Sequence, residues 1–298
     1  MKKILTIITL VLAAFLTLPA PVSGQAKQAK IQTRKVKLSD FTTKTTKVVL
    51  CGGALFDDAL QEEMARRWLV SPYEFCSLAE YEKLKGSPDY YFLIPASTKT
   101  RKEAESGIVT LTLMKGGLEK SDDPEKVGFD VISIPCAATE QPSGREFVFL
   151  PAFLDIIQRF MNDAMTSDRI SYGGLSAYSR KLLRDTGKKL VFSGDDFAEG
   201  TKQDPSWKDA GIEILDEDDA DDLFNQGAED TMVSYVVAPT DPKKGAVCYK
   251  MIISADTHEL CYFEKHTIKA GTPAGFLPFD LKIISLQRKK SLQSALPQ

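Results

Sequence analysis

The chain has 298 residues, of which 43% are hydrophobic and 27% are charged, a composition typical of a globular protein with enough length for two domains. Its formal net charge at pH 7 is −3. Seven basic residues and a single aspartate lie between positions 25 and 47, so the remaining sequence is acidic overall. This distribution argues against a nucleic-acid-binding surface on the folded part.

The N-terminus has the pattern of a secretory signal peptide. Lys2 and Lys3 precede an apolar run over residues 4–18, and small residues at 22–24 form a predicted cleavage site before Gln25. The run is too short for a comfortable membrane span. We therefore predict a signal peptide over 1–24 and a mature chain without a transmembrane span, periplasmic or secreted. The style of this leader resembles that of exported proteins of Bacteroidetes-type bacteria, and this resemblance is limited to the leader and the first mature residues.

Residues 25–46 are predicted to form a basic, flexible arm. Solvation alone explains such an arm, and contact with an anionic lipid or glycan is the alternative. The five cysteines are an odd number and contain no C-x-x-C spacing, so we expect no disulfide-dependent fold and at least one unpaired thiol. An unpaired thiol or an exposed edge strand also leaves self-association open.

Two stretches of the chain, about 140 residues apart, share one plan. In the first, an apolar strand at 48–50 leads to Gly52-Gly53, then to a helix that Asp57 caps and that carries Trp68, and then to a strand at 73–76. A capping box at Ser77 opens a short acidic helix, and a strand at 90–94 is expected to stop at Pro95.

The second stretch repeats this order with one difference. Its elements are a strand at 190–192, Gly194 with Asp195-Asp196, Trp207, a strand at 212–215, an acidic helix from 216 and a strand at 233–237. The difference is at residues 199–205, which are predicted as loop where the first copy has a helix. We interpret the pattern as an internal duplication. The predicted domains are 47–187, with connecting helices, and 188–298.

Each copy is predicted to end in an antiparallel hairpin. The first hairpin has strands at 108–114 and 130–134 around an exposed loop at 119–126, and the alternating threonines of 108–114 predict one face in water. The second pairs 246–253 with 259–266. Helices are expected over 151–165, with Pro151 in the first turn, and over 175–184. The fold class is therefore α/β (α+β), with two similar mixed-sheet domains that each carry helices and a C-terminal hairpin.

The corner between strand and helix in the first copy is the best-shaped candidate for ligand binding. Gly52 and Gly53 bring backbone amides toward a helix start, where an anion can bind. No nucleotide-binding glycine motif is present, and Asp57 and Asp58 would compete with a phosphate. A role for the two aspartates in capping and in the helix dipole explains the corner more simply.

Cys248 and His266 are the candidate catalytic residues. If Ala255 pairs with Glu259 in the second hairpin, Cys248 falls opposite His266, and a thiolate–imidazole pair becomes feasible. A register shift of one residue separates the two side chains. No orienting Asn or Asp can be assigned, and the first copy has no counterpart.

The acidic run at 216–222 invites a calcium site, but the glycine and the distal glutamate of an EF-hand loop are missing. We expect a helix with an acidic first turn there, no metal site and no cofactor.

The leading hypothesis is a non-enzymatic binding or accessory protein of the bacterial cell envelope, whose partner is another envelope protein or a small ligand between the copies. The alternative is a secreted hydrolase that uses acidic residues or the Cys248/His266 pair.

Overall fold

The computed structural model describes residues 33–98, 103, 106–118, 127–179, 187–201 and 205–295. The predicted leader, residues 25–32 of the basic arm, the loop at 119–126 and the last part of the helix predicted at 175–184 lie outside these residues. The rest of the predicted arm is not a flexible segment, because residues 34–46 form a short helix, a 3₁₀ turn and the start of the first strand. Residues from Arg34 onward form one compact unit.

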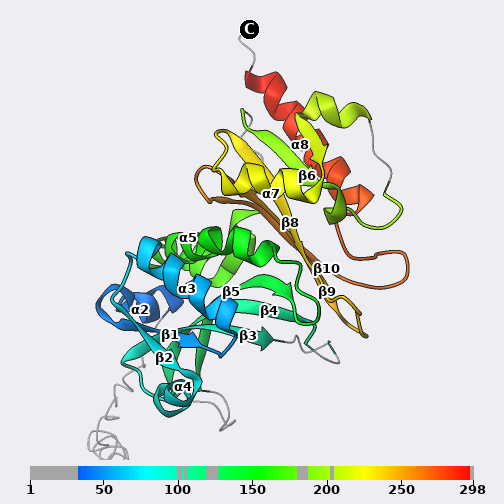
Figure 1. The fold of residues 1–298 in the computed structure, drawn as a ribbon. Coiled ribbons are helices and arrows are strands. Elements are labelled where there is room, and N and C mark those ends of the chain that lie inside the picture. Colours follow the sequence, from blue (N-terminus) through cyan, green and yellow to red (C-terminus); the bar gives the residue numbers. More distant parts are fainter. Residues whose placement is uncertain are drawn as a thin grey trace, which may run out of the picture. The chain divides into compact units, whose positions relative to one another are not determined.

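The first half contains a five-stranded mixed sheet in the order β2-β1-β3-β4-β5 (Figure 1). Its elements are α2 (Arg34–Leu38), η1 (Phe41–Thr43), β1 (Thr45–Leu50), α3 (Ala54–Arg67), β2 (Tyr73–Ser77), α4 (Leu78–Leu84), β3 (Tyr90–Thr98), β4 (Ile108–Leu118), β5 (Val127–Ala138), α5 (Arg145–Thr166), α6 (Asp168–Gly173) and η2 (Gly174–Tyr178). Strands β2 and β3 are parallel to β1, and β4 and β5 extend the sheet in antiparallel fashion.

The second half contains a sheet with the order β7-β6-β8-β9-β10. Its elements are β6 (Lys189–Ser193), η4 (Gly194–Asp196), η5 (Pro205–Ala210), β7 (Ile212–Leu215), α7 (Glu217–Asn225), β8 (Thr231–Val237), β9 (Val247–Ser254), β10 (Leu260–Thr267) and α8 (Pro278–Ala295). Again the first three strands are parallel and the last two form an antiparallel hairpin. Strand order and direction therefore match between the halves, which confirms the predicted fold class.

The two tryptophans occupy equivalent places. Trp68 is buried with residues of α5 on one face of the first sheet, and Trp207 is buried with residues of α8 on the corresponding face of the second. Each packs edge-on or tilted against a phenylalanine: the Trp68–Phe41 ring centroids are 6.3 Å apart, and the Trp207–Phe197 centroids are 5.7 Å apart. The tryptophan that the two halves share in sequence therefore serves in each half to bury one face of the sheet.

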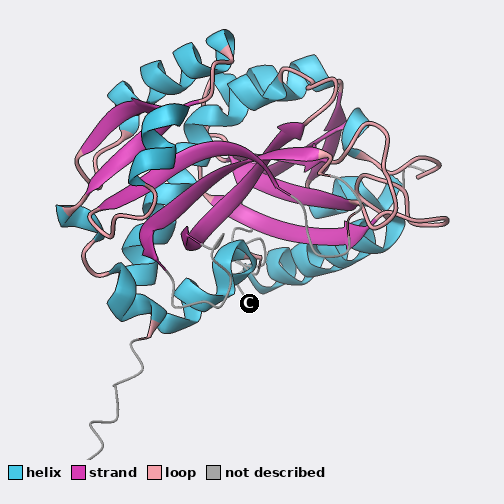
Figure 2. Ribbon diagram, turned by 90° about the horizontal axis from the view of Figure 1, so that it is seen from below, coloured by secondary structure: helices cyan, strands magenta, loops and turns pink. Residues whose placement is uncertain are grey.

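Helix α5 lies between the two sheets (Figure 1), and Figure 2 shows the strands in the middle of the molecule with helices around them. It contacts α3 and β5 of the first half and α7 of the second. Its apolar side chains and those of β8 and β9 belong to one continuous hydrophobic core. The second sheet is consequently covered on both faces, by α5 and α7 on one side and by η5 and α8 on the other, which explains why β9 is buried at nearly every position.

Two local predictions were wrong at their boundaries. Strand β3 continues past Pro95 to Thr98 because its pairing with β1 ends at Leu93, so the missing N–H of Pro95 lies beyond that ladder. Helix α5 begins at Arg145, which places Pro151 in its interior and makes the apolar residues 147–150 helical. Pro278, in contrast, does open α8.

The threonine face of β4 is also different from the prediction. Thr110 and Thr112 are buried, with 4% and 2% of their surface exposed. Their hydroxyls satisfy each other at 3.0 Å, and Thr112 donates to Ser133 on β5 at 2.9 Å. Cross-strand hydroxyl pairs therefore allow alternating polar positions to be buried.

Among the described helices, none combines the length and the apolar composition that crossing a bilayer requires.

Candidate functional site

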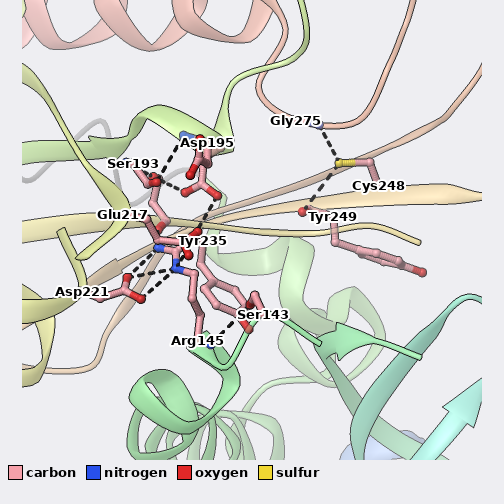
Figure 3. A network of polar contacts seen from close by, with 12 residues as sticks. Ser143, Arg145, Ser193, Asp195, Glu217, Asp221, Tyr235, Cys248, Tyr249 and Gly275 are labelled. Atoms are coloured by element: carbon pink, nitrogen blue, oxygen red, sulfur yellow. Dashed lines mark hydrogen bonds and ion pairs between the residues drawn. The ribbon is translucent and has the colours of Figure 1, made fainter. Parts of the chain in front are cut away.

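A buried polar cluster lies where the two halves meet, around the guanidinium of Arg145 (Figure 3). Arg145 is the first residue of α5 and only 5% exposed. Its Nε and Nη2 donate to the carboxylate of Asp221 on α7 at 2.8–3.0 Å, and Nη1 donates to Asp196 in η4 at 3.0 Å. Nη2 also donates to the backbone carbonyl of Ser234 on β8 at 3.1 Å. One cation of the first half thus binds three elements of the second.

The chain preceding α5 positions this arginine. Gly144 has φ +94°, a left-handed conformation that glycine adopts without strain, and it turns the chain into the helix. The carboxylate of Glu146 accepts the Gly144 N–H at 2.9 Å. The guanidinium carbon then lies 5.4 Å from the ring centroid of Phe149 and 5.2 Å from that of Tyr235, so aromatic faces enclose it.

Asp196 completes the cluster. It is 3% exposed, and it accepts hydrogen bonds from Arg145 and from the hydroxyl of Ser234, whose oxygen in turn accepts the Ser193 N–H at 3.0 Å. Burial raises the pKa of Asp196, and the nearby guanidinium opposes this rise. Burial also raises the pKa of Glu217, which lies 3.7 Å from Nε of Arg145.

Chemically, this cluster is a closed ion-pair network. Burial tends to lower the pKa of Arg145, but Asp196 and Asp221 raise it well above its ordinary value, so the guanidinium stays charged. Its three nitrogens, Nε, Nη1 and Nη2, all donate to protein oxygens. The network is therefore suited to joining the halves, and a substrate would have to displace the carboxylates to reach it.

A small polar cavity also lies at the junction of the halves. It has a volume of about 80 Å³ and is lined by loops of both halves, with Ser106, Thr139, Glu140, Thr240, Asp241 and Lys243 among its residues. The loops are tied together, because Thr240 donates its hydroxyl to the carbonyl of Glu140 at 2.6 Å. Gly107 faces Pro239 so closely that a Cβ on Gly107 would come within 2.3 Å of the proline ring. Residues with hydroxyl, carboxylate and ammonium groups thus line one opening, and the Lys243 ammonium forms an ion pair with Asp241.

The predicted anion corner is satisfied internally. Asp57 does not cap α3, which begins three residues earlier after Gly53. Its buried carboxylate instead accepts the N–H groups of Cys51 at 3.1 Å and Gly52 at 2.8 Å. Of the two predicted anion-binding amides, that of Gly52 is therefore occupied by a side chain, which locks the turn, and Asp58 is exposed to solvent.

The predicted pairing of Cys248 with His266 is confirmed, but the register near the turn is different: Leu260 pairs with Ile253, and a bulge between Leu260 and Tyr262 shifts the pairing by one residue. The two side chains have other partners: the Cys248 thiol accepts the Gly275 N–H at 3.2 Å, and His266 Nε2 lies 2.8 Å from the carbonyl of Pro273. Burial raises the pKa of Cys248 to about 11 and lowers that of His266. A protonated thiol beside a neutral imidazole is the opposite of the ion pair that a cysteine nucleophile uses.

The acidic run forms the start of α7, with Asp216 at the N-cap and Ala220 and Phe224 buried. One of its carboxylates, Asp221, is the partner of Arg145. Within the part of the chain that the structure describes, no three His, Cys, Asp or Glu side chains are placed to hold a metal ion.

Sequence reasoning missed the Arg145 cluster and the cavity residues. A lone arginine at the start of an apolar stretch, followed far along the chain by Asp195-Asp196, was a usable signal for the cluster. Nothing local marked the cavity, because its lining comes from three separate loops. A comparison with protein-family models, with curated proteins and with solved structures finds no match to this chain.

Proposed function

We propose that this chain is a non-enzymatic binding or accessory protein of a bacterial cell envelope, acting through the surface where its two halves meet. The observation that carries the proposal is the junction cavity, to which loops of both halves contribute hydroxyl, carboxylate and ammonium groups. Ligands bind preferentially at the junction of domains, and a volume of about 80 Å³ limits the occupant here to a very small polar group.

The chemistry of the other candidate groups supports binding over catalysis. The thiol of Cys248 is held protonated, and the carboxylates near Arg145 are paired with it. The Asp57 carboxylate occupies the amides of Cys51 and Gly52 at the strand–helix corner. A small polar ligand or a loop of another envelope protein is the class of occupant that a shallow opening of this chemistry fits.

The test of binding uses native mass spectrometry on the protein purified without denaturation from the envelope of its own host. Thr139→Trp and Thr240→Trp fill the cavity. Thr257→Trp is the matched control, since Thr257 is equally exposed and lies at the opposite end of β9. We expect a retained mass on the wild type and on the control, and its loss in both cavity variants. Identical spectra for all four proteins would refute the assignment of this cavity.

The hydrolase alternative is separated by Cys248→Ser and His266→Gln in a strain whose own copy is deleted. A binding protein keeps its phenotype with either substitution. Loss of the phenotype at an unchanged melting temperature would instead support catalysis. N-terminal sequencing of the envelope-purified chain checks the predicted cleavage, with Gln25 as the expected first residue.

A further inference from the structure

The charge of the chain is strongly polarised along its length. Removing Lys2 and Lys3 from the net charge of −3 leaves −5, and residues 25–47 carry +6, so residues 48–298 carry −11. An anionic surface would therefore attract one end of the mature protein and repel the rest. The described start of the basic end is α2, which packs against α6.

Basic and aromatic side chains gather where α2 meets β5 and α6. A cavity of about 240 Å³ there is lined by Arg34, Lys37, Phe129 and Tyr172. The guanidinium carbon of Arg34 lies 5.4 Å from the ring centroid of Phe129, and the ammonium of Lys37 lies 5.8 Å from it. Both cations thus lie over one aromatic ring beside an opening to solvent.

Two further cations extend this group. Lys35 is on the same helix, and Arg169 is an exposed residue of α6. Arg169 lies three positions before Tyr172, on the same side of the helix, and Tyr172 is 63% exposed. We call Arg34, Lys35, Lys37, Phe129, Arg169 and Tyr172 the basic–aromatic face.

The nearby carboxylates only partly offset these charges. Asp168 accepts the backbone N–H of Lys35 at 3.2 Å, and Asp130 lies next to Arg34, whose guanidinium donates to the Asp130 backbone carbonyl. Four cations against two carboxylates leave the face positive.

We propose that the basic–aromatic face docks the protein on a bilayer of anionic phospholipid, with a headgroup phosphate between Arg34 and Lys37. Basic clusters bind anionic membrane surfaces electrostatically, and exposed tyrosine favours the headgroup layer. Val36, 50% exposed on the same short helix, adds an apolar contact. The acidic remainder is repelled by the lipid charge, which turns it toward the solvent. The proposal is independent of what the junction cavity binds.

The experiment measures co-sedimentation of the chain starting at Gln25 with vesicles, so that the apolar run at 4–18 contributes nothing. The vesicles contain phosphatidylcholine alone or with about a third of phosphatidylglycerol, at low and high salt. Each cation near the surface contributes roughly a fivefold factor in partitioning, so Lys37→Glu/Arg169→Glu is expected to weaken binding to the anionic vesicles by about 25-fold or more. The control is Lys208→Glu/Lys282→Glu, an equal charge change at exposed positions of η5 and α8, with an expected loss of less than about twofold.

The outcomes separate the possible ligands. Binding to phosphatidylglycerol vesicles that falls with salt, and that only the first double variant weakens, supports the proposal. Equal loss in both double variants, equal binding to uncharged vesicles, or no binding at low salt would overturn it. Inorganic phosphate is titrated separately, and saturation by phosphate without vesicle binding would identify the cavity as a free-anion site and also overturn it.

Discussion

Replacement of Arg145 by methionine should strongly destabilise the protein. Methionine keeps the length of the side chain and its contact with Phe149, but it leaves Asp196 and Asp221 without their cation, and the side chains of these aspartates are only 4% and 12% exposed. Removing one partner of a buried ion pair costs about 3–5 kcal/mol, because an uncompensated charge stays in a low-dielectric site. Since domains are stable by about 5–15 kcal/mol, this loss is about a fifth or more of the free energy of unfolding.

The assay is urea unfolding followed by circular dichroism and by tryptophan fluorescence. Variants with Trp68→Phe or Trp207→Phe leave one reporter in each half, and we expect their transitions to coincide in the presence of Arg145 and to separate in Arg145→Met. The loss should also depend on pH. Without the guanidinium, the folded-state pKa of Asp196 rises further above its unfolded value, so the neutral carboxyl is tolerated. Stability is then retained at low pH and lost as pH rises through the raised pKa.

Two variants decide whether this reasoning holds. Adding Asp196→Asn and Asp221→Asn to Arg145→Met removes the stranded charges and should recover part of the loss. Arg66→Met is the matched control: its ion pair with Glu62 on α3 is exposed by 62% and 60%, and its loss should stay below about 1 kcal/mol. The reasoning fails if Arg145→Met costs no more than this control, or if its cost is the same at pH 4 and pH 7.

Three further outcomes follow from local geometry. Asp57→Ala should lower the free energy of unfolding in urea by about 2 kcal/mol, because two backbone amides lose a charged acceptor. Asp58→Ala should change it by less than about 0.5 kcal/mol, because Asp58 is exposed. Equal effects of the two substitutions would contradict the role of Asp57 in locking the turn. Cys51 is the one exposed thiol among the five cysteines. Intact-mass analysis after treatment with iodoacetamide should therefore show one adduct on the native chain and five on the chain unfolded in urea. A second adduct on the native chain would contradict the burial of the other four thiols. Burial opposes the effect of Lys188 on Asp256, but the hydrogen bond from that lysine prevails and lowers the Asp256 pKa to about 2. Its stabilisation is therefore present above the ordinary pKa and lost as pH falls through about 2, and Lys188→Met should cost about 1 kcal/mol at pH 7 after solvent screening and nothing near pH 2.

The regular parts of the fold were predictable from local pattern. The repeated strand, glycine turn, tryptophan and acidic helix predicted two sheets of one topology. The turn at 255–258 predicted a hairpin, but a bulge between Leu260 and Tyr262, which the turn did not predict, was needed to bring Cys248 opposite His266. The capping box at Ser77 formed as expected, with the side chain of Ser77 accepting the Glu80 N–H. These features depend on residues close in sequence, which interact in the same way wherever the segment is placed.

The errors came from positions whose environment is set by distant segments. Pro95 lies in the middle of β3 without penalty only because β1 is shorter, and Thr110 is buried because Ser133 and Thr112 satisfy the hydroxyls of β4. Asp57 does not cap α3 as expected, because the turn at Gly52 brings the amides of Cys51 and Gly52 within hydrogen-bond distance of its carboxylate.

The order of residues alone predicted the fold class, the shared strand order of the two halves and the capping box at Ser77, because periodicity and turn chemistry act over a few residues. Only the tertiary structure decided that Arg145 neutralises Asp196 and Asp221, that Cys248 is held protonated, and that loops of both halves enclose one polar cavity. Ion pairing and desolvation depend on which groups meet in space and on how much water is excluded, and neither quantity is encoded in the spacing of residues along the chain.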